Sequence, residues 1–318
     1  MSNRTTVTEF LLLGFSDVWE LKILHFVVFL MIYLAGLLGN LLIITAIALN
    51  HHLHTPMYFF LVNLAILDLG SISVTIPKSM ANSLMNTRVI SYPGCVAQVF
   101  LFMFLGSADI GILTVMAYDR YVAICQPLHY ERVMNRRACM QMTATTWISS
   151  MLYSALHTGN TFALSLCGGN VVDQFFCDIP QLLKLACSDS EFSESGVIVF
   201  SACLALSCFI LIIVSYVQIF RSVLRIPSQQ GRRKAFSTCL PHLTVVSLFV
   251  FTGIIAYLKP SSRSISRLDL VVDVFYSMVP PMLNPIIYSM RNKDIKAALR
   301  KLIGWRLFMT NKKSIFIF

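Results

Sequence analysis

The chain has 318 residues, of which 56% are hydrophobic and only 13% are charged, and its formal net charge is +10. Soluble domains carry about a quarter charged residues, so this composition excludes an ordinary water-soluble protein and indicates one embedded in a lipid bilayer. A nucleic-acid-binding role has little support, because the basic residues are split among loops and form no folded basic domain.

Seven apolar windows, each close to the roughly 20 residues that cross a bilayer, follow one another along the chain. Three contain no Asp, Glu, Lys or Arg, namely 23–49, 196–220 and 235–258. Four are weaker: 57–76 contains Asp68, 96–118 contains Asp109, 138–162 is rich in Ser and Thr, and 270–290 contains Asp273 and three prolines. Membrane helices tolerate proline where neighbours satisfy the freed carbonyls, so we expect an all-α membrane protein with a seven-helix bundle.

The distribution of basic residues predicts which way the chain crosses the membrane. Of the 25 Lys and Arg residues, 17 fall on the side that holds Arg120, the loops after the third and fifth windows and the tail, and 8 fall on the other side. The positive-inside rule makes the richer side cytoplasmic, and a basic face there suits anionic lipid and an acidic partner. We therefore expect an extracellular N-terminus at 1–22, a seven-helix membrane domain at 23–290 and a cytoplasmic tail at 291–318.

The segments predicted to lie outside the cell carry candidate sites of glycosylation and disulfide formation. Asn3 lies in the only Asn-X-Ser/Thr sequon of the chain and is the predicted glycosylation site. Four of the nine cysteines also fall outside, namely Cys95, Cys167, Cys177 and Cys187. An even number there predicts two disulfides and leaves three connectivities open. The other five cysteines are interpreted as small buried apolar residues.

A basic amphipathic helix is predicted directly after the seventh window. Its apolar residues recur at helical spacing and its basic residues occupy the other face; the two sets are Ile295, Ala298, Leu299, Leu302 and Ile303, and Lys293, Lys296, Arg300 and Lys301. Because the chain offers no soluble core to receive the apolar stripe, we expect this helix to lie on the inner leaflet.

Polar residues inside the predicted spans are costly in lipid, so each is a candidate functional group. Asp68 and Asp109 lie mid-span, and two carboxylates that face each other would repel unless one is protonated or a cation sits between them. Asn40 and Asn284 could complete a hydrogen-bonded hub with them. The alternative interpretation is a membrane transporter or channel that uses Asp68 and Asp109 as an ion site, but no line of polar residues can be traced to both faces.

An acid and a base stand side by side near the cytoplasmic end of the third window. Asp119 and Arg120 lie within "MAYDRYVAIC", flanked by Tyr118 and Tyr121. A partly desolvated ion pair there could hold the helix ends in one state and release them to a partner that offers Arg120 a better contact. The alternative interpretation is a charge that only marks the edge of the membrane.

Five blocks of sequence resemble the signature of olfactory receptors, the largest branch of the rhodopsin-like G-protein-coupled receptors, and specifically the tetrapod-type class II. The blocks are "LHTPMYFFL" (53–61), "MAYDRYVAICQPLHY" (116–130), "SY" (215–216), "KAFSTCLPH" (234–242) and "PMLNPIIYSMRNKD" (281–294). They occur in the family's order and spacing, so the resemblance covers essentially the whole chain.

The resemblance implies a plasma-membrane receptor that couples a volatile odorant to a heterotrimeric, stimulatory, olfactory-type G protein and so to cyclic AMP. It implies a G-protein switch made of Asp119, Arg120, Tyr121, Tyr216, His242, Asn284, Pro285 and Tyr288. Asp68 and Asp109 match the acids at the position where related receptors bind sodium, although many members carry Glu in place of the shorter Asp109. The implied disulfides are Cys95–Cys177 and Cys167–Cys187.

The implied ligand pocket lies in the outer half of the bundle. It is formed by Phe102, Met103, Gly106, Ser107, Ile110, Phe200, Ser201, Leu204, Gly253, Tyr257 and Ser277. These residues carry a few hydroxyls and no charge, so an ionised ligand would lack a counter-ion and a small, neutral, mostly apolar ligand is expected. Each Met or Phe could instead be ordinary helix packing.

Two positions depart from the family pattern. Val250 stands where Tyr is usual, which removes a hydroxyl from the pocket floor. Pro241 stands where Ser is commoner and removes a backbone donor from the inner half of the sixth span.

No enzymatic activity is expected from this chain. His51, His52 and His54 lie close together but beside no Cys or acid at metal-ligand spacing. Neither a phosphate-binding glycine-rich loop nor a nucleophile elbow is present. No cofactor is expected apart from the candidate sodium ion, and the expected partners are the odorant, the G protein and membrane lipid.

Overall fold

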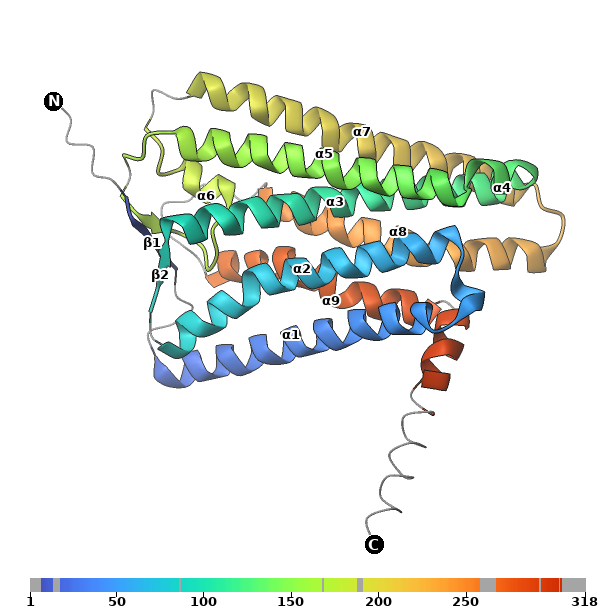
Figure 1. Ribbon diagram of the computed structural model, residues 1–318, viewed down its shortest axis with the longest axis horizontal. Coiled ribbons are helices and arrows are strands. Elements are labelled where there is room, and N and C mark those ends of the chain that lie inside the picture. Colours follow the sequence, from blue (N-terminus) through green and yellow to red (C-terminus); the bar gives the residue numbers. More distant parts are fainter. Residues whose placement is uncertain are drawn as a thin grey trace, which may run out of the picture.

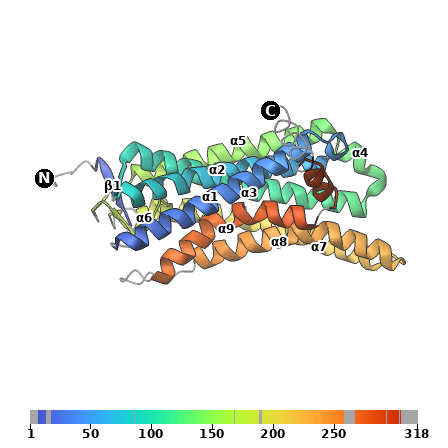
Figure 2. The same ribbon diagram turned by 90° about the horizontal axis from the view of Figure 1, so that it is seen from below.

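The computed structural model describes residues 7–13, 18–85, 87–167, 169–187, 191–257, 267–291, 293–302 and 304. Within these residues, seven long helices run roughly alongside one another in a single bundle (Figures 1 and 2), and they are α1 (Trp19–Ala48), α2 (Pro56–Met85), α3 (Tyr92–Cys125), α5 (Arg136–Ala163), α7 (Glu191–Leu224), α8 (Gln229–Tyr257) and α9 (Arg267–Arg291). Each contains all or most of one predicted window, so the predicted seven-helix membrane fold is confirmed.

The seven helices differ in how apolar they are, and so in how clearly their own composition predicts that they cross a membrane. Among the described residues, five helical stretches are long and apolar enough to cross a membrane, lying in α1, α2, α3, α7 and α8. The other two, α5 and α9, correspond to the window rich in Ser and Thr and to the window with three prolines. Large apolar side chains face outward from α1 and α7, as expected of helices surrounded by hydrocarbon.

The helix α9 remains helical through Pro280, Pro281 and Pro285. Pro285 has no N–H, so the carbonyl four residues earlier, that of Pro281, loses its partner within the helix. Asn40 on α1 donates to that carbonyl oxygen at 3.1 Å and also to the carbonyl of Gly36 at 3.0 Å. A side chain on a neighbouring helix therefore compensates for the proline, as membrane helices require.

The helix α3 is the central element of the bundle. It contacts α2, α5, α7 and α8, whereas α1 packs against α2 and α9. Its first turn is capped by Ser91, whose hydroxyl accepts a hydrogen bond from the backbone N–H of Gly94 at 3.3 Å. Residues along α3 can therefore reach neighbours at both ends of the bundle and at its middle.

A small sheet, which the sequence analysis did not predict, covers one end of the bundle. Strand β1 (Glu9–Leu12) lies between β2 (Val89–Ser91), which is antiparallel to it, and β3 (Val171–Val172), which is parallel. The short helix α6 (Ile179–Leu183) lies beside this sheet (Figure 1). We call this end the sheet end.

The opposite end carries the short connections and the tail, and we call it the tail end (Figure 1). Its elements are η1 (His51–Leu53), η2 (Pro127–His129), α4 (Tyr130–Val133) and the helical residues 293–302. The loop between α5 and α7 belongs to the sheet end and holds the disulfides Cys95–Cys177 and Cys167–Cys187, with Cα atoms 5.6 and 5.0 Å apart.

The predicted amphipathic helix forms over residues 293–302, but its apolar stripe does not depend on lipid alone. Ile295 and Ala298 belong to the main apolar core, which also contains Leu53 and Ile47, and Leu302 is buried as well. The expectation that nothing in the protein receives this stripe is therefore wrong, because the tail end of the bundle does. The basic residues Lys293, Lys296, Arg300 and Lys301 are exposed as predicted, and Ile303 lies outside the described residues.

Candidate functional site

Four of the predicted pocket residues of α3 lie in its sheet-end half, and Ile110 lies just beyond its midpoint. Phe102, Met103, Gly106, Ser107 and Ile110 are all partly buried. The hydroxyl of Ser107 donates to the carbonyl of Phe104 at 3.1 Å, a bond within the helix itself. This face of α3 can therefore offer mostly apolar contacts to a ligand.

The predicted pocket residues on the other helices are less uniform. Ser201 on α7 is paired with His157 on α5, its hydroxyl lying 2.6 Å from Nε2 of that ring. Its neighbours Phe200 and Leu204 are 48% and 42% exposed, so they face outward rather than into the bundle. Gly253 is partly buried on α8 and Ser277 is buried on α9. The side chain of Tyr257 lies outside the described residues.

His157 is a polar group that the sequence analysis did not single out. It lies on the buried face of α5, and the ring of Tyr153 is 4.3 Å from its own. Its partner Ser201 on α7 was a predicted pocket residue, and the hydrogen bond between the two places His157 beside the predicted pocket. The pair places two hydrogen-bonding groups beside an otherwise apolar region.

Two buried acids and an amide meet in the middle of the bundle. Nδ2 of Asn284 on α9 lies 3.0 Å from each carboxylate oxygen of Asp68 on α2. Asp109 on α3 is also buried. Asn40, predicted as a further member of this hub, instead bonds to backbone carbonyls.

Several oxygens at this hub have no hydrogen-bond partner among the described residues. They are Oδ1 of Asp109, Oδ1 of Asn284 and the hydroxyl oxygen of Tyr288, and each is buried. Buried oxygens without a donor cost free energy unless a proton, water or cation satisfies them. The donor set, two carboxylates and further neutral oxygens, fits a small hard cation better than a transition metal, which would favour imidazole or thiolate ligands.

Near the tail end, Asp119 and Arg120 form the predicted ion pair. Nε of Arg120 donates to Oδ2 of Asp119 at 2.9 Å, and Nη2 contacts the same oxygen. The Asp119 side chain is 1% exposed and that of Arg120 is 12% exposed. The pair is thus shielded by the bundle, which favours a structural switch over a charge that only marks the membrane edge.

Tyr130 completes this pair, although the sequence analysis gave it no role. Its hydroxyl donates to Oδ1 of Asp119 at 2.8 Å, so both carboxylate oxygens are occupied. Burial, together with the nearby Asp119 carboxylate, raises the pKa of Tyr130, so the phenol stays protonated and able to donate at neutral pH. The signal for it was its place at the end of the 116–130 block.

With the cyclic AMP coupling that the resemblance implies, Tyr130→Phe is expected to raise the basal cyclic AMP level of cells that express the protein. The change keeps the ring but removes one donor to Asp119, so the pair opens more readily. Loss of a hydrogen bond to a charged group shifts the closed–open equilibrium by about 1.5 kcal/mol or more, roughly tenfold at the switch. Basal cyclic AMP, divided by surface expression, measures the effect, and Tyr118→Phe on the exposed side of the helix serves as control. Equal basal levels in the two variants would contradict a role for Tyr130.

A second closed contact joins three helices close to this pair. The hydroxyl of Tyr216 on α7 lies 2.7 Å from Nδ1 of His242 on α8, and Nε2 of His242 lies 2.9 Å from the carbonyl oxygen of Leu113 on α3. A carbonyl only accepts, so Nε2 carries the proton and Nδ1 accepts from the tyrosine. All three groups are buried, and we call this contact the histidine lock.

The remaining predicted switch residues take no part in these two contacts. Tyr121 is partly buried and its hydroxyl accepts from Nε2 of Gln126 at 3.1 Å. Tyr288 is buried, and Pro285 lies on the same helix one turn closer to the sheet end. The structure therefore brings Asp119, Arg120, Tyr216 and His242 into closed contacts, while Tyr121 and Tyr288 stand outside them.

A groove of about 490 Å³ lies between α7 and α8 beside the histidine lock. It is lined by apolar side chains that include Tyr216, Val246 and Val250. Val250, expected at the floor of the ligand pocket, therefore lines the seam between α7 and α8. Pro241 is buried within α8, directly before His242 in the lock.

Comparison with known proteins gives a consistent family assignment. A family model described as "Olfactory receptor" matches residues 29–305. Human olfactory receptor 14A16 is 55% identical over 307 residues, which cover 96% of this chain and 99% of that protein. Human olfactory receptor 14I1 is 56% identical over 309 residues, covering 97% and 98% of the two chains. Human olfactory receptor 14C36 is 52% identical over 303 residues, covering 95% and 97%.

Proposed function

The chain belongs to the olfactory receptor family, and on this premise we propose how it senses its odorant. It is an odorant-sensing G-protein-coupled receptor of the plasma membrane that crosses the bilayer several times. Its ligand is a small, neutral, mostly apolar volatile that binds in the sheet-end half, against the partly buried face of α3. Occupancy activates a stimulatory, olfactory-type G protein at the tail end and raises cyclic AMP.

The sheet end faces the outside of the cell in this proposal. Disulfides form in oxidising compartments, and both disulfides lie at the sheet end. The exposed basic residues of 293–302 lie at the tail end, which the positive-inside rule makes cytoplasmic. The N-terminus, including the predicted glycosylation site Asn3, lies outside the described residues.

The observation that carries the proposal is the histidine lock, because one side chain ties α8 to both α3 and α7. The ligand binds against α3 on the sheet-end side of this contact, and Leu113 accepts the lock bond on the same helix. A small shift of α3 against α8 lengthens the bond from His242 to Leu113 and frees α8 to move. Movement of α8 opens the tail end around Arg120, whose guanidinium then meets the G protein instead of Asp119.

The proposal is tested in cells that co-express the protein with an olfactory-type G protein and are challenged with volatile mixtures. A rise in cyclic AMP that requires both the receptor and the G protein is expected. Control cells lack either the receptor or the G protein. Ligand-driven current or uptake without cyclic AMP would support the transporter or channel alternative instead.

We also propose that a sodium ion binds between Asp68 and Asp109 in the resting receptor. The buried, unpartnered oxygens of Asp109 and Asn284 support it. Asp68, Asp109 and Asn284 would hold the ion, which would supply positive charge between two carboxylates that otherwise repel. The ion would tie α2 to α3 and so favour the closed state.

Sodium is expected to raise the melting temperature of the purified receptor, and Asp109→Asn is expected to remove that effect. Sodium at about ten times its Kd would stabilise the folded state by about 1.4 kcal/mol, because it binds the native form alone. Thermal unfolding in sodium and in potassium at equal ionic strength measures the difference. Equal melting temperatures in the two salts for the unmodified receptor would rule the site out.

A further inference from the structure

The loop between α5 and α7 enters the bundle at the sheet end instead of lying across it. Phe175 and Phe176 are 2% and 0% exposed, and Gln174 and Cys177 are equally buried. The Phe175 ring is 6.0 Å from that of Phe29 on α1, and the Phe176 ring is 5.0 Å from that of Phe102 on α3. The loop thus fills space between α1, α2, α3 and α9 with its own side chains.

A disulfide alone does not explain how this loop is held at that depth. The start of the loop is held by the pairing of β3 with β1 and by the hydrogen bond from the N–H of Leu13 to the carbonyl oxygen of Gln174, and the Cys95–Cys177 bond ties the loop to α3 at a single point. A second point of attachment lies three residues further along α3, at Gln98. Residues three apart face the same side of a helix, so Gln98 lies one turn deeper than Cys95 on the loop's side.

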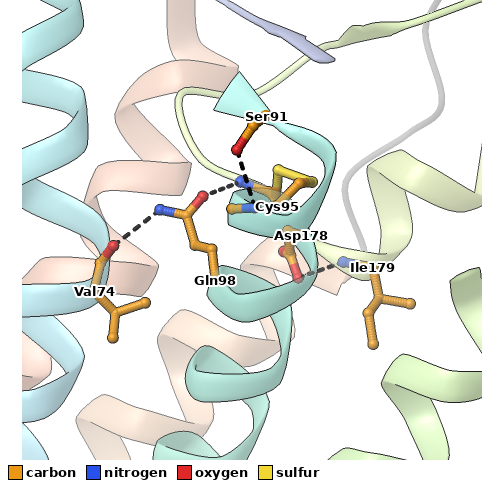
Figure 3. Close-up of a disulfide and its surroundings, with 8 residues drawn as sticks. Val74, Ser91, Cys95, Gln98, Asp178 and Ile179 are labelled. Atoms are coloured by element: carbon orange, nitrogen blue, oxygen red, sulfur yellow. Dashed lines mark hydrogen bonds between the residues drawn. A yellow bond between two sulfur atoms is a disulfide. The ribbon is translucent and has the colours of Figure 1, made fainter. Parts of the chain in front are cut away.

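Gln98 binds both the loop and a neighbouring helix (Figure 3). Its Nε2 donates to the carbonyl oxygen of Val74 on α2 at 2.9 Å, and its Oε1 accepts from the backbone N–H of Cys177 at 2.8 Å. A carbonyl only accepts and an N–H only donates, so the amide fits in one orientation. The side chain is 6% exposed, which makes both bonds costly to lose.

We propose that Gln98 is a positioning residue that sets how deeply the loop enters the bundle, and that Phe176 is thereby the wall closing the odorant pocket on the side of α2 and α9. The inference rests on the proposed odorant-binding function. Phe176 covers Phe102, a predicted ligand contact, and reaches the core that includes Met278 on α9. The space for ligand is therefore confined to the side of α3 that faces α5, α7 and α8, and the receptor selects short odorants.

The first test measures the depth of the loop without any odorant. Phe102→Cys places a thiol beneath Phe176, and a membrane-impermeant thiol reagent is applied to intact cells. Labelling of the unmodified receptor is subtracted, because five native cysteines are free. Adding Gln98→Leu is expected to speed labelling at least about tenfold, because two buried hydrogen bonds that hold the loop closed are lost. Gln98→Glu keeps an acceptor for the Cys177 N–H, so its labelling rate is expected to lie between that of Phe102→Cys alone and that of Phe102→Cys with Gln98→Leu.

The control for this test is Thr114→Val in the same Phe102→Cys background. Among the described residues, the Thr114 hydroxyl donates only to the carbonyl of Ile110 within α3, at 2.8 Å, so this change removes a hydrogen bond but leaves the loop untouched. Surface expression is measured for every variant by antibody binding to a tag at the N-terminus. If Gln98→Leu labels no faster than Thr114→Val, Gln98 does not set the depth of the loop.

The second test measures selectivity with a series of straight-chain aliphatic aldehydes and alcohols of increasing length. Gln98→Leu and Phe176→Ala are both expected to shift the preferred length toward longer members, because both open the same space. A purely structural defect would lower all responses together without changing their order. If both variants rank the odorants of the series in the same order as the unmodified receptor, the proposal is overturned. If the unmodified receptor responds to none of them but Gln98→Leu still speeds thiol labelling, the result counts against the proposed function alone.

Discussion

Arg120→Ala is expected to abolish the odorant-driven rise in cyclic AMP while leaving the receptor at the cell surface. The guanidinium is paired with Asp119 in the structure, and in the proposed mechanism it is the group offered to the G protein when the tail end opens. Removing the charged group that would contact the G protein costs that interface about 2–5 kcal/mol, so coupling should fall by roughly 30-fold or more. Asp119 keeps its bond from Tyr130 in the variant, which limits damage to the fold.

The measurement is the concentration–response curve for cyclic AMP, normalised to surface expression. Arg120→Lys is the matched variant, because it keeps the charge but lacks the planar fork that makes two contacts to one carboxylate. We expect it to retain weak signalling. Full signalling by Arg120→Ala would show that this residue is only a charge at the membrane edge.

Cys177→Ser is expected to remove most of the receptor from the cell surface. The change breaks the Cys95–Cys177 bond and leaves a hydroxyl and a free thiol in the buried cluster that anchors the loop. Loss of a native disulfide costs about 2–5 kcal/mol, a large part of the stability of a typical domain. Gln98 cannot compensate, since it holds the same residue through a single hydrogen bond.

Surface antibody staining and total protein, measured in the same cells, separate loss of folding from loss of signalling. Cys203→Ser is the matched control, because that cysteine is free and exposed on α7. Its surface level should equal that of the unmodified receptor. Wild-type expression and signalling by Cys177→Ser would contradict the assigned role of the disulfide.

Hydropathy and motif spacing were sufficient to predict the bundle, because lipid forces each apolar window to satisfy its own backbone as a helix. The apolar stripe of residues 293–302 was also predicted, in this case from the helical spacing of its apolar residues alone. The burial of this stripe against the bundle was not predicted, because it depends on how the tail folds back onto the helices. The bond from Tyr58 to Asp294, at 3.1 Å, shows this contact across 236 positions of sequence.

The candidate site was predicted where a pattern is local and missed where it depends on contacts distant in sequence. Asp119 and Arg120 are adjacent, so their pairing could be read directly. Tyr130 reaches Asp119 only because the chain turns after α3, and His157 reaches Ser201 across 44 positions. Asn40 was assigned to the acidic hub because it is a mid-span amide, but the carbonyl freed by Pro285 accepts its hydrogen bond instead.

The depth to which the loop between α5 and α7 enters the bundle could not be predicted from the sequence. "DQFFCD" places two phenylalanines beside a disulfide cysteine, but polar residues flank them and no periodicity indicates that Phe175 and Phe176 enter the bundle. Phe200 and Leu204 show the converse, because the resemblance to olfactory receptors implied that both contact the ligand, whereas the structure leaves both largely exposed. A helix presents several apolar faces in a membrane, and only packing decides which one faces inward.

In the proposed mechanism, a ligand bound near the sheet end opens the tail end by moving α8 away from α3. The most direct test is the distance between spin labels at positions 137 on α5 and 233 on α8, both exposed near the tail end. The labels should be attached through genetically encoded amino acids, because five native cysteines are free. With the most active volatile and the G protein present, we predict that this distance increases. A distance that stays unchanged while cyclic AMP rises in the same variant would contradict the account.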